Sequence, residues 1–529
     1  MPMISGAMQD YALTLDKFID HAAKWHPTGK IVTAREDGST ARASFAEIRE
    51  RARRFSALLA GLGIGVGDHV ATLAWNCQVH VEAWYGIMGM GAVCHTLNPR
   101  ITAAQLAAMV QQSHAKLIVA SAALLPLARD IAARAPGIEA VLIDGDLPAN
   151  GNGALRVLSI EAELAAVTNE VPWGNFDERT PAGLCFTSGT TGAPKGVTYT
   201  HRSNFLHANR LLQADVFGVT RRDVVLPAVP MFHANAWGIP FAAPSVGAGL
   251  VMPGRNADGA SLARLIRDEG VTIAVGVPTV WVGLVDYVER EGIELPTLER
   301  IMVGGAPMPP ALMQRIETGL GVTVQTSWGM TELSPLGTIS MAADPEREAG
   351  NSGRPTLGID LMLYDASGAP LPQQRGHEGH LYVRGPAVVE RYFGQQESAT
   401  NADGWFDTGD LAIIDERGNL TITGRSKDLI KSGGEWINPA EIEALVTTLP
   451  QVSFAAVIGR SDPKWGERPL LLVELRGNES IEDEALLAPL SGRIAPWWMP
   501  DAVIRLDNMP LASTGKIDKI RLRAEYSGS

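Results

Sequence analysis

Residues 187–196 combine the side-chain types that bind phosphate groups. The stretch reads Thr-Ser-Gly-Thr-Thr-Gly-Ala-Pro-Lys-Gly, with three glycines, four hydroxyl side chains and one lysine. It follows the apolar run 183–186, so a strand that ends in a turn is predicted here. Glycines let backbone N–H groups approach an anion closely, while the hydroxyls and Lys195 add donors and positive charge.

The spacing of this stretch differs from that of a Walker A loop. The sequence has Gly189-x-x-Gly192-x-x-Lys195-Gly196, whereas a Walker A loop has four residues between its first glycine and Gly-Lys-Ser/Thr. Loops rich in glycine, serine and threonine also form plain turns. Composition alone therefore leaves a phosphate-binding loop and a plain turn as equal alternatives.

Further polar or glycine-rich segments follow predicted strands and turns. His233 lies among aromatic residues between apolar runs, Asp410 follows a turn, and Lys516 lies in a loop near the C-terminal end. The segments are 230–238, 304–307, 326–332, 405–410, 424–438 and 510–516.

Alternating helices and strands are expected to position these segments. Residues 45–62 have apolar side chains at helical spacing, and residues 69–74 are typical of a buried strand. Such alternation predicts parallel sheets covered by helices. The other predicted helices are 79–90, 103–113, 261–269 and 309–318, and the other predicted strands are 92–96, 116–119, 273–277, 300–303 and 322–325.

The pattern changes toward the C-terminal end. Short strands between Gly, Pro and Asp turns at 375–415 predict a small β-rich subdomain. A helix at 439–447 and strands at 452–458 and 469–475 then predict a small α+β domain. We therefore expect an α/β protein with a large N-terminal domain, 1–426, containing two parallel-type sheets covered by helices and the β-rich subdomain, and a C-terminal domain, 427–529.

The composition indicates a soluble globular enzyme of more than one domain. The chain has 529 residues, of which 46% are hydrophobic and 19% charged. A formal net charge of −13 argues against nucleic acid or an anionic membrane surface as a partner. Three cysteines, Cys77, Cys94 and Cys185, are too few for a disulfide framework or a zinc site and indicate buried thiols in a reducing cytosol.

Neither a secretory signal nor a membrane span is expected. The N-terminal segment has early aspartates and lacks a basic start followed by an apolar run. The uncharged stretch 234–254 is long enough to cross a bilayer. Its prolines and glycines would break a spanning helix repeatedly, so a buried segment of strand and turn is predicted instead.

In this order, the segments resemble those of the adenylate-forming superfamily, which includes acyl-CoA synthetases, 4-coumarate–CoA ligases, luciferases and peptide-synthetase adenylation domains. Residues 231–238 and 431–436 are most similar to bacterial medium- and long-chain fatty-acyl-CoA synthetases and 3-methylthiopropionate–CoA ligases. The resemblance implies a cytoplasmic ligase that uses ATP, Mg²⁺ and coenzyme A. A carboxylic acid would attack the α-phosphorus of ATP, and the thiol of coenzyme A would then displace AMP.

The resemblance assigns the phosphates and the metal ion to two segments. Glu332 and Thr187 would hold Mg²⁺, and Thr331 would contact the α-phosphate. Outside the motif, Glu332 is also explained as an acid in the first turn of a helix. The residues expected around the β- and γ-phosphates are Thr187, Ser188, Gly189, Thr190, Thr191, Gly192 and Lys195.

The adenosine would lie between two further segments. Asp410 would accept hydrogen bonds from the ribose hydroxyls, beside Arg425, although a turn aspartate is the alternative reading. The family more often has tyrosine where Trp328 stands, and either ring offers adenine a flat face. The residues expected around the base are Gly305, Ala306, Pro307, Ser327, Trp328, Gly329, Met330 and Thr331.

The acyl group would lie near His233 and Trp237. His233 would line the pocket near the carboxylate, and Trp237 matches a gate residue of the long-chain members. A core histidine and ordinary packing of the tryptophan are the alternatives. Small neighbours favour a medium- or long-chain or aryl-alkanoic acid over acetate. The other pocket residues expected are Val229, Gly238, Val277, Thr279, Gly304 and Thr326.

The C-terminal domain would serve both steps by swinging about a hinge near Lys427. One face would deliver Lys516, which would bridge the substrate carboxylate and the α-phosphate. An isolated Gly-Lys near a C-terminus is otherwise solvated. The other face would deliver the coenzyme A loop, with Lys431, Gly433, Gly434 and Trp436.

Three alternative functions stay open at this point. The chain could load a carrier-protein thiol, act as an oxygenating luciferase-like enzyme, or be an inactive nucleotide-binding scaffold. The presence of Lys195, Glu332, Asp410 and Lys516 argues against the scaffold. No nucleic acid and no stable membrane insertion are expected, whereas related synthetases often form homodimers through the large domain.

Overall fold

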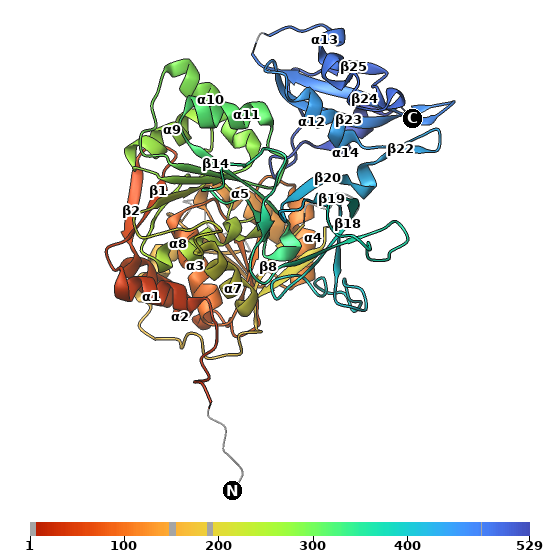
Figure 1. Ribbon diagram of the computed structural model, residues 1–529. Coiled ribbons are helices and arrows are strands. Elements are labelled where there is room, and N and C mark those ends of the chain that lie inside the picture. The colour runs from red at the N-terminus through yellow and green to blue at the C-terminus, as the bar shows by residue number, and fades with distance from the viewer. Residues whose placement is uncertain (1–6, 148–154, 188–193, 478, 529) are drawn as a thin grey trace.

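The alternation at the start of the chain builds a sheet of mainly parallel strands (Figure 1). The computed structural model describes residues 7–147, 155–187, 194–477 and 479–528. Strands β8 and β9 pair antiparallel, and the other neighbours pair parallel. In spatial order the strands are β7 (Arg156–Ser159), β6 (Ala140–Ile143), β5 (Leu117–Ala120), β3 (His69–Leu73), β4 (Val93–Thr96), β8 (Pro181–Phe186) and β9 (Gly196–Thr200).

A second sheet has a parallel centre and antiparallel edges. The parallel run extends from β14 to β1, while β2, β15 and β16 pair antiparallel with their neighbours. In spatial order the strands are β16 (Arg354–Pro355), β15 (Leu336–Ile339), β14 (Thr323–Gly329), β13 (Arg300–Val303), β12 (Ile273–Gly276), β10 (Val224–Pro227), β11 (Gly249–Met252), β1 (Lys30–Ala34) and β2 (Thr40–Ser44).

Helices cover both faces of each sheet and form layers. One apolar core joins inward side chains of both sheets to helices α1, α2, α3 and α8, so these helices lie between the sheets. Helices α4 and α5 cover the outer face of the first sheet, and α9, α10 and α11 cover that of the second. The bounds are α1 (Asp16–Trp25), α2 (Phe45–Gly61), α3 (Gln78–Gly89), α4 (Ala103–Ser113), α5 (Leu125–Arg134), α6 (Ile160–Ala166), α7 (His201–Leu211), α8 (Ile239–Ser245), α9 (Gly259–Asp268), α10 (Pro278–Glu291) and α11 (Pro310–Gln314).

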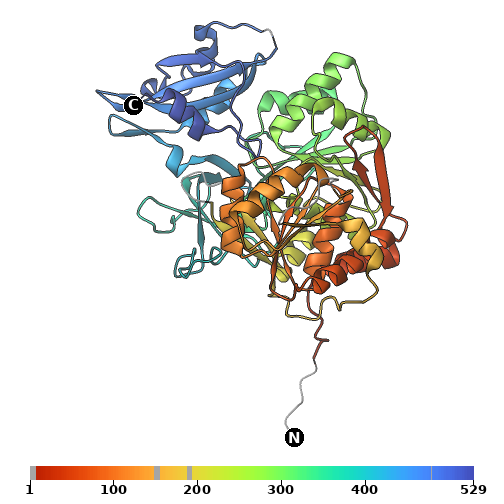
Figure 2. The same ribbon diagram turned by 180° about the vertical axis from the view of Figure 1, so that it is seen from behind.

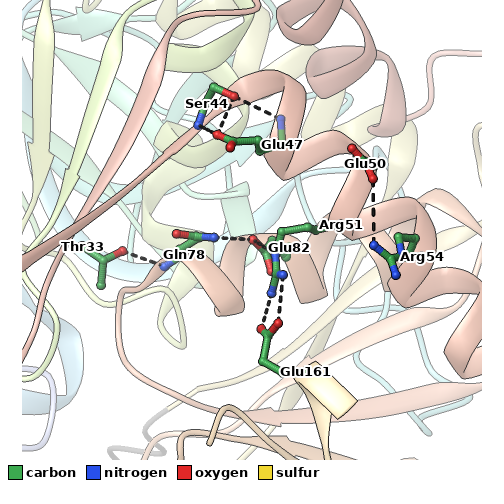
Figure 3. Close-up of polar contacts among 9 residues, drawn as sticks. All are labelled: Thr33, Ser44, Glu47, Glu50, Arg51, Arg54, Gln78, Glu82 and Glu161. Atoms are coloured by element: carbon green, nitrogen blue, oxygen red, sulfur yellow. Dashed lines mark hydrogen bonds and ion pairs between the residues drawn. The ribbon is translucent and has the colours of Figure 1, made fainter. Parts of the chain in front are cut away.

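Helix α2 shows how the sequence determines one of these elements. Ser44 and Glu47 form a reciprocal capping box at its N-terminus, which satisfies backbone N–H groups that have no partner inside the helix. On the helix, Arg51 donates to Glu82 of α3 over 2.9 Å and pairs with Glu161 of α6 (Figure 3). A buried carboxylate on α3 is thereby paired with a cation from α2.

The stretch 234–254 is partly helical, which corrects the expectation of strand and turn alone. Helix α8 precedes β11, and it contains Pro240 in its first turn and Pro244 inside. A first-turn proline removes an N–H that has no partner in a helix. Pro244 cannot donate to the carbonyl of Pro240, but the Tyr85 hydroxyl donates to that oxygen over 2.8 Å. Of the helices in the described ranges, none is long and apolar enough to cross a membrane.

The β-rich subdomain and the C-terminal lobe follow. The subdomain is an antiparallel sheet of β17 (Asp360–Tyr364), β18 (Glu378–Arg384), β19 (Phe406–Ile414) and β20 (Leu420–Arg425). The blue C-terminal elements form a lobe beside the green helices α9–α11 and above the strands β18–β20, as seen from both sides (Figures 1 and 2, Figure 2 from behind). The lobe contains β21 (Ile430–Ser432), β22 (Glu435–Ile437), β23 (Val452–Asp462), β24 (Gly466–Leu475), β25 (Ala502–Arg505), α12 (Pro439–Val446), α13 (Asp483–Leu487) and α14 (Lys519–Tyr526). The predicted α/β class, with parallel sheets and a smaller C-terminal part, is confirmed.

Candidate active site

A cavity of about 2520 Å³ lies between the body of the chain and the C-terminal lobe. Its floor is the edge of the second sheet where the parallel strands β10, β12 and β13 end, which is where α/β proteins place ligands. Described residues from all the polar segments reach it, except for those at 431–436. The predicted residues that line it are Thr187, Lys195, Val229, His233, Trp237, Val277, Thr279, Gly304, Gly305, Ala306, Pro307, Thr326, Ser327, Trp328, Gly329, Met330, Thr331, Glu332, Asp410, Arg425 and Lys516.

The two ends of the glycine-rich loop meet at this cavity. The Thr187 N–H donates to the carbonyl of Lys195 over 2.9 Å, and the Lys195 N–H donates to the Thr187 hydroxyl over 3.3 Å. These bonds join the end of β8 to the start of β9. Ser188, Gly189, Thr190, Thr191 and Gly192 lie outside the described residues.

Tyr392, a residue that the sequence analysis did not single out, links Lys195 to Glu332. Its hydroxyl donates to Glu332 Oε1 over 2.9 Å, and Lys195 Nζ lies 4.6 Å from the centre of its ring. The backbone N–H of Val389 donates to the carbonyl of Glu332, and that of Phe393 donates to the carbonyl of Gly196. These two bonds fix the segment around Tyr392 to Glu332 and to the start of β9. No residue type or spacing in Glu390-Arg-Tyr-Phe distinguishes this tyrosine from a packing residue.

Each of the two carboxylate oxygens of Asp410 has a donor partner. Arg425 Nε lies 2.7 Å from Oδ1, and the indole N–H of Trp328 donates to Oδ2 over 2.9 Å. Asp410 and Arg425 are register partners on β19 and β20, and Trp328 is on β14. A carboxylate has about four acceptor sites, so Asp410 keeps acceptor capacity toward the cavity.

Strand β14 also runs further than predicted. It pairs parallel with β13 up to Thr326 and then antiparallel with β15 from Ser327 to Gly329. The predicted loop after the strand is therefore strand up to Gly329. A Cβ on Gly337 would come within 2.5 Å of the Trp328 ring, so this glycine makes room for the indole.

Lys516 enters the cavity from the lobe. Its Cε lies 3.7 Å from where a Cβ on Gly305 would stand. The Lys516 side chain stays accessible to solvent in the open cavity. Desolvation by the cavity walls and the charge of Arg425 lower its pKa to about 8, against the opposing effects of Asp410 and Glu332. Burial and the charge of Lys516 lower the pKa of His233 to about 4, so its imidazole is neutral at pH 7.

Trp237 sits on a left-handed turn beside Lys516. Residues 234–238 all have positive φ, from 44° to 75°, in a region that non-glycine residues rarely adopt. The carbonyl of Trp237 is 3.0 Å from His207 Nε2 on α7, and the indole lies 3.0 Å from where a Cβ on Gly304 would stand. Backbone strain of this kind clusters at functional sites.

Some of the predicted residues lie away from the cavity. A Cβ on Gly238 would come within 2.7 Å of the His207 ring, so this glycine makes room for His207 rather than for a substrate. Lys431, Gly433, Gly434 and Trp436 lie on the β21–β22 hairpin of the lobe. Gly433 packs against Trp465, whose carbonyl accepts its N–H over 2.7 Å.

Comparison with known families and proteins gives a consistent result over the whole length. The family described as AMP-binding enzyme matches residues 19–393, and the AMP-binding enzyme C-terminal domain matches residues 441–516. The 3-methylmercaptopropionyl-CoA ligase of Ruegeria lacuscaerulensis is 40% identical over 533 residues, covering 98% of both chains. The medium-chain-fatty-acid–CoA ligase of Ectopseudomonas oleovorans is 38% identical over 531 residues, covering 98% of this chain and 97% of the relative.

A solved structure has the same fold. The anthranilate CoA ligase AuaEII, in complex with anthranoyl-AMP, aligns with a TM-score of 0.88 over 98% of both chains. Its sequence identity to this chain is 22%, so this likeness shows the fold alone.

Proposed function

Since the chain belongs to the AMP-binding enzyme family, we propose that it is an AMP-forming acid–thiol ligase that converts a hydrophobic carboxylic acid to its coenzyme A thioester. ATP and the acid would give an acyl-adenylate and pyrophosphate, and coenzyme A would then release AMP. The observation that carries the proposal is the convergence of Lys516, Asp410 and Glu332 on one cavity. They come from three separate parts of the chain, and each offers a group that this chemistry needs.

Adenylation requires positive charge and hydrogen-bond donors around the phosphates, because negative charge gathers there in the transition state. Lys195 and the hydroxyl of Thr187 would serve the β- and γ-phosphates together with the loop 188–192. Thr331 would contact the α-phosphate, and the Lys516 ammonium would lie between that phosphate and the attacking carboxylate. Neutral His233 would line the carboxylate end of the acyl pocket without competing for the same anion.

Asp410 would orient the nucleotide by accepting from the ribose hydroxyls. Arg425 and Trp328 already fix the carboxylate, so it loses little conformational entropy when ATP binds. The base would lie along Gly305, Ala306 and Pro307, with the segment Ser327–Met330 opposite.

The cavity also fits a magnesium ion. Glu332 is buried and lines the cavity, and its Oε2 accepts no hydrogen bond from the described residues. Mg²⁺ is usually held by one or two carboxylates together with substrate phosphates, so Glu332 and the Thr187 hydroxyl would hold it. When bound, the ion would neutralise charge on the departing pyrophosphate.

For the second step we propose rotation of the lobe, residues 427–529, about a hinge near Lys427. Lys516 lies in the cavity here, whereas Gly433 and Gly434 lie outside it on the lobe. A rotation that withdraws Lys516 would allow the hairpin with Lys431, Gly433, Gly434 and Trp436 to reach the acyl-adenylate and guide the thiol of coenzyme A. Because Gly433 and Gly434 have positive φ and no side chain, the thiol arm could pass close to the backbone.

The acid is proposed from the walls of the acyl pocket. Val229 and Val277 give it apolar walls, with Trp237 at one side. The hydroxyls of Thr279 and Thr326 also line it and donate to backbone carbonyls. Both relatives named above are acyl-CoA ligases, one named for 3-methylmercaptopropionate and one for medium-chain fatty acids. We propose a medium- or long-chain fatty acid or an aryl-alkanoic acid as substrate, with the short thioether acid as the second candidate. A cytoplasmic location and a homodimer formed through the N-terminal domain are further parts of the proposal.

A panel of acids with ATP, Mg²⁺ and coenzyme A tests the function. Release of AMP and formation of the thioester, measured by mass spectrometry, are expected for at least one fatty, aryl-alkanoic, cinnamic or short thioether acid. The Lys516→Ala variant is expected to lose acid-dependent exchange of pyrophosphate into ATP but to convert supplied acyl-adenylate and coenzyme A to thioester. AMP release that depends on a carrier protein instead of free coenzyme A would favour the carrier-loading alternative.

A further inference from the structure

We propose that Arg100 is a positioning residue for adenylation that docks the loop carrying Lys516 onto the body of the chain. The inference rests on the proposed two-step function. Arg100 lies in the segment after β4, far in sequence from the lobe. Its guanidinium NH1 donates to the carbonyl of Ser513 over 3.0 Å.

Two aromatic rings of the body also contact the guanidinium. Its central carbon lies 5.7 Å from the centre of the Trp75 ring and 5.8 Å from that of Phe232. Both distances are within the range in which an aromatic ring attracts a cation. The backbone N–H of Arg100 also donates to the Asn98 side chain over 3.0 Å. Arg100 therefore presents a fixed donor at the rim of the cavity.

The loop of Lys516 is shaped to receive such a donor. Ala512 N–H donates to the carbonyl of Lys516 over 2.7 Å, and Gly515 N–H donates to that of Ala512 over 2.8 Å, so residues 512–516 form a tight turn. This turn directs the carbonyls of Ser513 and Gly515 toward the body. The Thr279 hydroxyl donates to the carbonyl of Gly515 over 3.1 Å. Two donors from the body, Arg100 and Thr279, thus form hydrogen bonds with the turn just before Lys516.

Within the described part of the chain, Arg100 forms no ion pair that would compete with its bond to Ser513. In its bond to Ser513, a charged guanidinium donates to a neutral carbonyl, and such a bond is strong enough to align a loop. The bond can also break without the separation of an ion pair. This contact exists only while Lys516 is in the cavity, so the second step, which uses the other face of the lobe, does not need it.

The proposal predicts that loss of the guanidinium slows the first half-reaction but not the second. Removing the guanidinium weakens the docked pose that adenylation requires. A hydrogen bond to a charged group corresponds to about tenfold to hundredfold in an equilibrium, so a loss of this size is expected in adenylation. Thioester formation from supplied acyl-adenylate is expected to stay within about twofold or to become faster, because the pose it must leave is less stable.

The experiment compares Arg100→Ala, Arg100→Lys and Arg290→Ala in the full chain. Arg290 is a matched control, since it is an exposed arginine 5.3 Å from the centre of an aromatic ring, that of Tyr287, and lies on α10. Acid-dependent pyrophosphate exchange into ATP measures the first step, with the best acid of the panel above. Conversion of the corresponding acyl-adenylate and coenzyme A to thioester measures the second.

Arg100→Ala is expected to slow only the first step, Arg100→Lys to restore part of it through its own donor, and Arg290→Ala to change neither. Equal losses in both steps, or no loss in the first, would overturn the role of Arg100. These outcomes differ from failure of the proposed function, in which the unaltered protein would use no acid of the panel at all.

Discussion

At the scale of single residues, Lys516, the residue proposed to assist adenylation, lies in the cavity and has a lowered pKa. Its pKa of about 8 is set mainly by desolvation at the cavity walls and by the neighbouring Arg425. The ammonium is the form that can bridge two anions, and it predominates below this pKa and is lost as the pH rises above it. We therefore predict that kcat/KM for ATP in pyrophosphate exchange falls about tenfold per pH unit above pH 8, because kcat/KM reports ionisation of the free enzyme.

The Lys516→Arg variant provides the control for this profile. A guanidinium stays protonated throughout the range, so the alkaline fall should disappear even though the altered geometry lowers the rate. A wild-type profile that stays flat up to pH 9.5, or an Arg variant with the same fall, would show that another group controls the rate.

Tyr392 carries a second prediction at this scale. Tyr392→Phe removes the hydroxyl that donates to Glu332 and keeps the ring beside Lys195. We expect pyrophosphate exchange to fall about tenfold, the lower end of the effect of a hydrogen bond to a charged group, and the half-saturating concentration of free Mg²⁺ to rise. Tyr287→Phe on α10 is the matched control. An unchanged Mg²⁺ dependence would mean that Tyr392 packs without orienting Glu332.

The site residues also show how far sequence reasoning reaches. Trp328, Asp410 and Arg425 were each expected at the nucleotide because their motifs resemble those of a known superfamily. The indole–carboxylate bond between Trp328 and Asp410 was not expected, because it depends on how β14 packs against β19. Residue types reveal which groups can pair, whereas the packing of sheets decides which of them do.

At the scale of elements, the left-handed turn at 234–238 stores backbone strain. A left-handed conformation costs a non-glycine residue about 1–2 kcal/mol. Ala236 is fully buried with φ 45°, and glycine would adopt this conformation without that cost. Glycine also gains entropy in the unfolded chain, which offsets about 0.4–1 kcal/mol. Loss of the buried Ala236 methyl costs about 0.8 kcal/mol more. We therefore predict that Ala236→Gly changes the free energy of unfolding, measured in urea, by less than about 0.5 kcal/mol.

The matched control is Ala242→Gly, because Ala242 is equally buried but lies inside helix α8. There the loss of the same buried methyl adds to the cost of glycine inside a helix, so the free energy of unfolding should fall by about 1.5–2 kcal/mol. Equal destabilisation by both substitutions would mean that the turn around Ala236 is not strained.

Element types were more predictable from sequence than element ends and exceptions. The helix predicted at 103–113 is α4 with the same bounds, because a capping threonine and periodic apolar residues mark it locally. Helix α8 was missed, because the carbonyl exposed by Pro244 is satisfied by Tyr85 from α3, a contact that no local pattern reveals. Asp410 lies within β19, where a turn had been expected just before the strand.

At the scale of the whole molecule, alternation of helices and strands predicted parallel sheets, but not their number of strands or order. Strand β1 from the start of the chain pairs with β11, and β8 pairs with β4 across a long insertion. Such long-range pairings follow from burial of both sheet faces, which local periodicity does not encode. The function proposed here depends on a further whole-molecule property, the rotation of the lobe.

A reversible crosslink tests that rotation directly. Thr279 and Gly515 meet where the lobe docks on the body, and a Cβ on Gly515 would lie 3.1 Å from Thr279 Oγ1. Because Oγ1 occupies the place of a cysteine sulfur, this proximity brings a sulfur at position 279 within reach of a cysteine at 515. A cysteine at 515 also has to adopt the positive φ of 81° that Gly515 has. The native thiols should not interfere, because burial raises the pKa values of Cys77 and Cys94 to about 12 and that of Cys185 to about 11.

We predict that the oxidised Thr279→Cys, Gly515→Cys protein retains pyrophosphate exchange, because Lys516 is held in the cavity. Its conversion of supplied acyl-adenylate to thioester should fall more than tenfold, because the hairpin of Gly433 and Gly434 cannot reach the cavity. Reduction with dithiothreitol should restore the second step, and each single variant should be insensitive to oxidation. If the oxidised double variant, with its disulfide verified by mass spectrometry, forms thioester as fast as the reduced one, both half-reactions proceed in one pose and the hinge at Lys427 has no part in the reaction.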